Sequence, residues 1–340
     1  MINKKDFLKQ FLKLVNEHKK IIITSHKSPD PDSVASVLGL NYFLKTIFKK
    51  QNVTIVYEDK PNNATSLFSN PKEITFVEDL SKEVNKEDLL IILDTNEPNR
   101  FTDFFQDLIN TKVTTVCIDH HIKYQEDLPY NLSYIDINSI ALTHNIYDLF
   151  LKEKVKELDV TIAEFLMLGI LADSGFFNFL RKDKTSILNT AKDLIDNFDF
   201  KPNEFGVKYF APTKEIFKGV QILHKSLNFK KLPNFPEFSY THLTKEDLQQ
   251  NDLNDLFVAR RSFAKNLYNV NGVNWGFIVY PSKDKGWDIT FRSLPNTVDC
   301  QKLAKDFFAG GGHINAAGGH VTDEEISYKE VLEIVFKRLS

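Results

Sequence analysis

The first half of the chain repeats short apolar runs that amphipathic stretches separate. The runs, which we predict to be strands, are Ile21–Thr24, Val53–Val56, Leu89–Leu93 and Val113–Ile118. Because each run is apolar throughout rather than alternating, both of its faces are expected to be covered. Helices are predicted between the strands, at 32–48 and 100–110. This order is typical of a parallel sheet with helices on both faces.

The remaining pattern predicts more helices and a second region of strands. Apolar residues recur at helical spacing in 1–15, 141–155, 160–172, 186–196 and 214–223. Pro233 and Pro236 then interrupt regular structure, and we place a hinge there. Beyond it, strands are predicted at 275–280 and 287–292 around a turn at 283–286. Helices at 299–308 and 323–339 are expected to flank a glycine-rich loop.

The length of 340 residues exceeds that of one ordinary domain. We therefore expect an α/β protein of two domains, the first built on a parallel sheet and the second a smaller α/β unit. Residues 1–200 would form the catalytic domain, 201–236 a helical linker, and 237–340 a substrate-binding domain. The active site is expected in a cleft between the two domains.

Composition narrows the class of partner and the compartment. Forty-three Lys and Arg against 46 Asp and Glu give a net charge of −3, so no long basic track for nucleic acid is expected. Two cysteines exclude a disulfide framework and a zinc-finger cluster, and they favour a cytoplasmic location. The most apolar stretch, 161–180, contains Glu164 and Asp173, so no membrane span is expected.

Acidic and histidine residues follow the ends of three predicted strands. His26, Asp30 and Asp32 follow the first strand, Asp94 ends the third, and Asp119-His120-His121 ends the fourth, while Asp173 closes the helix from 161. In an open parallel sheet, ligands bind at this edge. Taken singly, Asp30, Asp32 or Asp94 reads equally well as a helix cap, and a histidine as a structural residue. Taken together, aspartates this close would repel one another without a cation.

The mixed carboxylate and imidazole donors favour Mn²⁺ or a similar divalent ion over structural zinc. Asp94 lies centrally in the pattern, where its two oxygens would bridge two ions about 3.5–4 Å apart. Two ions at that spacing activate a shared water and stabilise the oxygens of a phosphate undergoing displacement. The pattern therefore predicts a two-metal site for phosphate chemistry.

The order of these motifs resembles the four-motif signature of the DHH phosphoesterase superfamily. By that resemblance, His26, Asp30 and Asp94 would hold one metal ion, and Asp32, Asp94, His120 and Asp173 the other. Asp94, Asp119, His120 and His121 would carry the catalysis, with His121 on the phosphate. Pro31 stands where family members commonly have glycine, so the loop there must need neither a positive φ nor an N–H donor.

Five of the thirteen glycines fall within 310–319, beside Ala316 and Ala317. A flexible turn is one interpretation. Small residues on both sides instead favour close approach of a ligand, and consecutive glycine amides can bind an anion. Gly-Gly-Gly-His followed by Ala-Ala-Gly resembles the DHHA1 domain, which accompanies the DHH domain in one branch of the superfamily. That resemblance implies substrate or phosphate contacts at Arg100, His121, Arg292, Ser293, Gly311, Gly312 and His313.

The two motifs together resemble the NrnA type of stand-alone DHH–DHHA1 protein. This implies a Mn²⁺-dependent phosphodiesterase or phosphatase in which a hydroxide bridging two ions attacks the phosphate. The implied substrates are short oligoribonucleotides, diadenylates and 3′-phosphoadenosine 5′-phosphate, among which the sequence does not choose, and a homodimer is plausible for the family. Two alternatives stay open, a non-catalytic nucleotide-binding regulator and a manganese-dependent inorganic pyrophosphatase.

Overall fold

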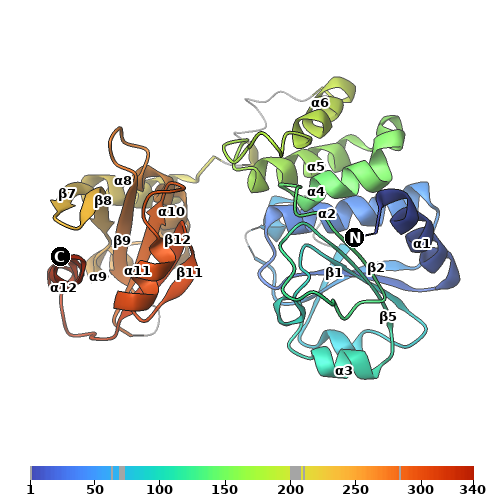
Figure 1. Cartoon of the computed structure of the whole chain (residues 1–340), viewed down its shortest axis with the longest axis horizontal. Helices are drawn as coiled ribbons and strands as arrows, with labels where there is room; N and C mark the ends of the chain where they lie inside the picture. The colour runs from blue at the N-terminus through green and yellow to red at the C-terminus, as the bar shows by residue number, and fades with distance from the viewer. Residues whose placement is uncertain (1, 63, 69–72, 200–207, 210, 283–284) are drawn as a thin grey trace. The chain divides into compact units, whose positions relative to one another are not determined.

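The computed structural model describes residues 2–62, 64–68, 73–199, 208–209, 211–282 and 285–340, with the backbone alone at 253–255. The chain divides into two compact units, Met1–Tyr209 and Phe210–Ser340 (Figure 1). Each unit has its own six-stranded sheet. The α/β fold expected from the sequence is confirmed. We describe the units separately.

The sheet of the first unit is parallel throughout, in the order β3-β2-β1-β4-β5-β6. Its strands are β1 (Ile21–Ser25), β2 (Val53–Glu58), β3 (Ile74–Val77), β4 (Leu89–Leu93), β5 (Thr114–Asp119) and β6 (Leu132–Ile135). The four central strands are those predicted from the apolar runs. The two edge strands were missed because each has only four residues and is partly exposed, which leaves no apolar run in the sequence.

Helices cover both faces of this sheet. Figure 1 shows α2, α4 and α5 on one side and α3 on the other. The helices are α1 (Lys4–Glu17), α2 (Pro31–Tyr42), α3 (Phe105–Asn110), α4 (Leu142–Ile146), α5 (Val160–Asp173) and α6 (Ile187–Asn197). Gly169 lets α5 approach α2 closely, since a Cβ there would lie 2.9 Å from the Cβ of Ala35. This contact fixes α5, and therefore Asp173 at its last turn, against the helix that begins at Pro31.

Pro31 is the first residue of α2, and Asp30 is its N-cap. The first helical position requires no N–H donor, and the φ of proline suits it. The Asp30 carboxylate accepts a hydrogen bond from Ser33 N at 2.9 Å. Proline at position 31, in place of the family's usual glycine, therefore introduces no strain into this loop.

The sheet of the second unit has the order β11-β12-β10-β9-β8-β7, with only the β8–β9 pair parallel. Its strands are β7 (Asn228–Leu232), β8 (Phe235–His242), β9 (Trp275–Pro281), β10 (Trp287–Ser293), β11 (Gly311–His313) and β12 (Ala316–Val321). Its helices are α8 (Lys214–Lys225), α9 (Lys245–Gln250), α10 (Leu253–Phe263), α11 (Cys300–Phe307) and α12 (Tyr328–Leu339). One face packs against α11 and α12 through a large aromatic cluster, and the other meets α8 and α10.

Two local expectations for this unit were wrong. The hinge placed at Pro233–Pro236 is the turn of the β7–β8 hairpin, where proline is tolerated because Pro236 precedes the part of β8 that pairs with β9. The glycine-rich loop is the β11–β12 hairpin. Residues 283–284 of the predicted turn, 201–207 and 210 of the predicted linker, and 200 at the end of the predicted catalytic domain lie outside the described residues.

Among the described residues, none of the helices combines the length and the apolar character that crossing a bilayer requires.

Candidate functional site

Three neighbouring strands of the first sheet deliver the acidic and histidine residues to one edge. β1 and β5 both pair with β4, so His26, Asp94 and Asp119 arrive side by side at the carboxyl ends. Asp94 has a left-handed backbone with φ 61°, and its N–H donates to Ile118 O at 3.1 Å. A non-glycine residue held there is uncommon, and such positions cluster at functional sites.

His26 is held so that one ring nitrogen faces the carboxylates. Its Nδ1 lies 2.8 Å from Lys27 O, so this nitrogen carries the proton and donates it. Nε2 then lies 3.4 Å from Asp94 Oδ2 and 3.7 Å from Asp30 Oδ2. A backbone acceptor on the far nitrogen is the usual arrangement for a histidine that binds metal through the other.

His120 repeats this arrangement from β5. Its Nδ1 faces Ser139 O at 3.5 Å. Its Nε2 lies 3.2 Å from Asp94 Oδ1, 3.4 Å from Asp173 Oδ2 and 3.9 Å from Asp32 Oδ2. Asp94 therefore stands between the two imidazoles, one on each of its oxygens.

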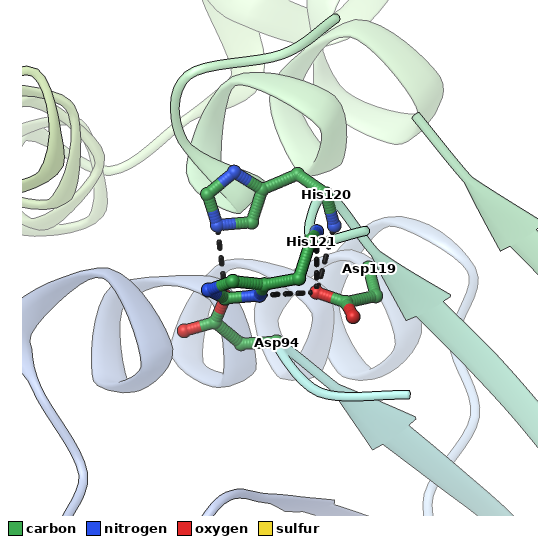
Figure 2. Close-up of side chains that lie close together, drawn as sticks. All are labelled: Asp94, Asp119, His120 and His121. Atoms are coloured by element: carbon green, nitrogen blue, oxygen red, sulfur yellow. Dashed lines mark hydrogen bonds and ion pairs between the residues drawn. The ribbon is translucent and has the colours of Figure 1, made fainter. Parts of the chain in front are cut away.

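Asp119 is fully buried and organises the loop that follows β5. Its Oδ1 accepts from His120 N at 2.7 Å and from His121 Nδ1 at 2.8 Å, as Figure 2 shows. Its Oδ2 accepts from Asn96 Nδ2 at 2.6 Å. The hydrogen bond to Nδ1 fixes the ring of His121, whose side chain is 43% exposed.

Asn96 was not predicted as a site residue. It is buried, and its amide also accepts from Tyr124 N at 2.9 Å. A single asparagine two residues after Asp94 carries no periodicity or motif from which the sequence alone would reveal this role. We assign Asn96 as a residue that positions Asp119.

Asp32 and Asp173 complete the second side of the cluster. Asp32 is buried, and its carboxylate accepts from Leu142 N at 2.6 Å and Thr143 N at 3.0 Å. It thus caps the first turn of α4 while facing His120. Asp173 reaches His120 from the end of α5.

The charges of the cluster are strongly coupled. Burial, followed by the charge of Asp94, raises the pKa of Asp32 to about 7. Burial and the charges of Asp32 and Asp94 raise the pKa of Asp173 to about 9. For Asp94 itself burial acts upward, but the imidazoles of His120 and His26 outweigh it and lower the pKa. Without a metal ion, the carboxylates of Asp32 and Asp173 therefore tend to bind protons at the position where a cation would lie.

The pKa values of the two imidazoles reflect the same competition between burial and nearby charges. Burial favours the neutral ring of His26, but Asp30 and Asp94 outweigh it and raise its pKa to about 10. His120 behaves likewise under Asp94, Asp32 and Asp173, again with a pKa of about 10.

The donor set fits divalent metal ions. Asp94 Oδ1 and His120 Nε2 are buried and form an ion pair with each other at 3.2 Å, but neither has a hydrogen-bond partner among the described residues. Buried polar atoms are almost always satisfied, so this pair indicates a missing ligand. Candidate ligand atoms within 4.8 Å of one another form three groups: His26, Asp30 and Asp94; Asp32, His120 and Asp173; and Asp94, Asp119, His120 and His121.

In the second unit, the register of the sheet places two of the predicted phosphate contacts, Arg292 and His313, on one face. Arg292 pairs with Ala316, which pairs with His313, so these three side chains share one face. Gly312 has φ 141°, and a Cβ there would lie 2.6 Å from Ala316 O. The backbone of the hairpin alone therefore requires glycine at this position. Gly311 lies on the open side, because a Cβ there would meet nothing within 4 Å.

Ser293 differs from the expectation. It follows Arg292 and so lies on the opposite face of β10. Its buried hydroxyl donates to Val298 O at 2.7 Å and accepts from Asn315 Nδ2 at 2.9 Å. The hydroxyl is therefore structural rather than a substrate contact.

Arg100 lies in the first unit near the first motif. It is exposed, and its backbone oxygen accepts from Lys27 N at 2.6 Å. The hydrogen bond places it next to His26, at the same edge of the sheet.

Comparison with known proteins finds one family match in the first unit and several relatives over nearly the whole chain. Residues 20–170 match the DHH family, N-terminal domain. The chain is 28% identical to a probable bifunctional oligoribonuclease and PAP phosphatase NrnA of Streptococcus mutans, covering 96% of this chain and 98% of that protein. It is 26% identical to the bifunctional oligoribonuclease and PAP phosphatase NrnA of Mycoplasma pneumoniae, covering 93% and 92%.

Among solved structures, an exopolyphosphatase-related protein from Bacteroides fragilis aligns with a TM-score of 0.81 at 21% identity, covering 98% of this chain and 96% of that one. This likeness shows that the fold is shared. Residues 20–170 therefore match the DHH family, N-terminal domain, and over nearly its whole length the chain is similar to proteins of the NrnA type.

Proposed function

We propose that the protein is a two-metal-ion phosphoesterase that hydrolyses short nucleotides to mononucleotides. The observation that carries the proposal is the pair of buried atoms without hydrogen-bond partners, Asp94 Oδ1 and His120 Nε2, at the centre of three overlapping groups of metal donors. The names of the two NrnA relatives support a nucleotide phosphoester as the substrate.

His26, Asp30 and Asp94 would hold one ion, and Asp32, Asp94, His120 and Asp173 the second. Carboxylate and imidazole donors without thiolate favour Mn²⁺. When bound, two such ions activate water near neutral pH and offset the charge of the phosphate.

The remaining residues of the site would bind and orient the substrate. His121 donates from Nδ1 to Asp119 Oδ1, and its Nε2–H would donate to a phosphate oxygen when the ring is an imidazolium. Arg100 is exposed beside the first motif, where its guanidinium would bind a phosphate oxygen. Arg292 and His313 would bind the substrate from the second unit, as in the predicted DHHA1 domain.

The test is hydrolysis of a ribodinucleotide by the full chain with and without Mn²⁺. We expect mononucleotides only with the metal, and none from Asp94→Ala or Asp119→Ala. Dinucleotide binding without turnover under Mn²⁺, Mg²⁺ and Co²⁺ would instead indicate a regulator. Pyrophosphate turnover exceeding that of dinucleotides would indicate a pyrophosphatase.

A side-by-side assay ranks the candidate substrates. A ribodinucleotide, a linear diadenylate, a cyclic diadenylate and 3′-phosphoadenosine 5′-phosphate share the phosphate chemistry and differ in what the second unit must hold. Equal enzyme and Mn²⁺ concentrations with all four give kcat/KM values that order them directly.

A further inference from the structure

Tyr57 is a fully buried tyrosine of β2 that no predicted motif includes. Strand β2 pairs with β1 up to the residues Ile55 and Ile23. Tyr57 and Ser25 each follow that pair by two positions, so both side chains lie on the same face of the sheet. Helix α2 packs against this face, and its Ser33 Oγ lies 3.0 Å from Tyr57 Oη. The tyrosine hydroxyl therefore meets the first turn of α2.

Three buried hydroxyls form one hydrogen-bonded chain that begins at Tyr57. Ser33 Oγ donates to Ser25 Oγ at 2.8 Å, and Ser25 Oγ donates to Leu93 O at 2.7 Å. A carbonyl oxygen can only accept, and each serine has a single hydroxyl proton, which it gives to the next member. The proton between Tyr57 and Ser33 must therefore belong to Tyr57. The hydroxyl chain runs in one direction, from Tyr57 to the Leu93 carbonyl.

The hydroxyl chain adjoins each of the three predicted ligands of the first ion. The contacts are Ser25 before His26, Leu93 before Asp94, and Ser33, whose backbone N–H donates to Asp30 Oδ1 at 2.9 Å. Asp32, a predicted ligand of the second ion, is held instead by backbone N–H groups of α4. Of the predicted ligands of the second ion, the hydroxyl chain therefore adjoins Asp94, which the two ions would share.

The far end of the hydroxyl chain holds the peptide unit between Leu93 and Asp94. The oxygen of this peptide accepts from Ser25 Oγ, and its N–H donates to Ile118 O at 3.1 Å. Hydrogen bonds on both sides fix the plane of the peptide and, with it, the left-handed backbone of Asp94. A non-glycine residue in this conformation costs about 1–3 kcal/mol and persists only where the surrounding structure over-determines it. The hydroxyl chain supplies one of those restraints.

The stability of the fold does not require these hydroxyls. The neighbouring positions of β1 and β2 are apolar and buried, and a phenylalanine at position 57 would bury the same ring. Replacing hydrogen-bonded polar groups by apolar groups of the same shape is often neutral for stability. A buried network in which every member is satisfied instead fixes one arrangement of the groups attached to it. Here those groups are the ligands of the first ion.

We propose that Tyr57 is a positioning residue for the first metal ion, acting through Ser33 and Ser25 on the three ligands of that ion. The inference rests on the proposed function and adds to its metal site a residue that touches neither ion nor substrate. Residues that orient metal ligands from behind typically contribute about 10–100-fold to metal affinity. The second ion depends less on Tyr57, because Asp32 and Asp173 are held by α4 and α5.

The test is a Mn²⁺ titration of the metal-free full chain, in which the electron paramagnetic resonance signal of free Mn²⁺ measures binding without any turnover. We expect the wild type to bind two ions. Tyr57→Phe should weaken the binding of one ion by about 10–100-fold and that of the other by no more than about threefold. The Mn²⁺ concentration that gives half the maximal rate on bis(p-nitrophenyl) phosphate should rise by the larger factor.

Tyr147→Phe is the matched control. Tyr147 is also buried in the first unit, but its hydroxyl donates to Asp193 Oδ2 at 3.4 Å, away from the predicted metal ligands. Its loss should leave both Mn²⁺ affinities unchanged. Ser25→Ala cuts the hydroxyl chain at its other end and should weaken the same ion as Tyr57→Phe. The double variant should be little weaker than Ser25→Ala alone, because both changes act through one network.

Unchanged Mn²⁺ affinities in Tyr57→Phe would overturn the inference. So would an equal weakening of both ions together with a lower melting temperature, since that is the result of a general loss of structure. Failure of the proposed function gives a different result. A wild type that binds two Mn²⁺ ions but hydrolyses neither bis(p-nitrophenyl) phosphate nor a ribodinucleotide would reject the phosphoesterase, while the affinities measured in Tyr57→Phe would still decide the positioning role.

Discussion

Asp94 is the residue on which the metal-site interpretation depends most. It contacts both imidazoles, with Oδ2 3.4 Å from His26 Nε2 and Oδ1 3.2 Å from His120 Nε2. Its position after a parallel strand was evident from sequence. Its left-handed backbone was not, because nothing in the pattern of apolar residues specifies φ at a single aspartate.

Replacing one carboxylate oxygen tests that role with minimal change of shape. We expect Asp94→Asn to lower kcat by at least about 100-fold, comparable to the loss of one preorganised group that stabilises a transition state. Mononucleotide release under Mn²⁺ measures the loss. Asp148→Asn, an equal change at a surface residue paired with Lys4, should retain activity. Activity within a few-fold of wild type in Asp94→Asn would contradict the bridging role.

The titration of the cluster predicts how metal binding depends on pH. In the metal-free protein the pKa values stand at about 7 for Asp32, about 9 for Asp173 and about 10 for His26 and His120. Metal ligands must be deprotonated, so binding releases protons. Because protons compete with the ion, affinity must rise as pH rises.

We therefore expect Mn²⁺ affinity to increase steeply between about pH 6 and pH 9, with net proton release at neutral pH. Calorimetric titration in two buffers of different ionisation enthalpy measures both quantities on the full chain. An affinity independent of pH over this range, with the same heat in both buffers, would show that these residues do not hold the ion.

At the scale of elements, long buried strands were predictable and short edges were not. β1 and β4 are buried along their whole length and β2 and β5 along most of theirs. Because both faces of these strands are covered, each contains an apolar run that is visible in sequence. β11 has three residues, Gly311–His313, and all are exposed. No hydrophobic signal exists in such a segment, and its glycines predict a loop on propensity alone.

The hairpin of β11 and β12 explains its glycines individually, and this separates structural from ligand-facing positions. A Cβ on Gly310 would lie 1.9 Å from Gly318 O. The chain would have to move, and overpacking of this kind typically costs about 1–3 kcal/mol. Gly311, the next residue, faces open space.

Gly310→Ala should therefore destabilise the protein by about 1–3 kcal/mol, while Gly311→Ala should change stability by less than about 0.5 kcal/mol. Urea denaturation followed by circular dichroism compares the two variants with the wild type. Equal destabilisation by both would mean that the hairpin register differs from the one described.

At the scale of the whole molecule, charge limits the substrate. Lys and Arg number 43 against 46 Asp and Glu, so the composition provides no excess of positive charge for a long nucleic acid. A polymer bound along an extended track releases counter-ions in proportion to the phosphates contacted, which makes affinity rise with length and fall steeply with salt. A site that holds only a few phosphates gains little from further nucleotides.

We therefore expect kcat/KM to be highest on RNAs of about two to four nucleotides and to fall at least tenfold by about twelve. Raising salt from about 50 to 200 mM should change KM on the dinucleotide only a few-fold, because few phosphates are neutralised. A length series assayed at both salt concentrations gives both results. Affinity that grew with length and collapsed in salt would require a basic surface that the composition does not provide, and would place long RNA rather than short nucleotides in the site.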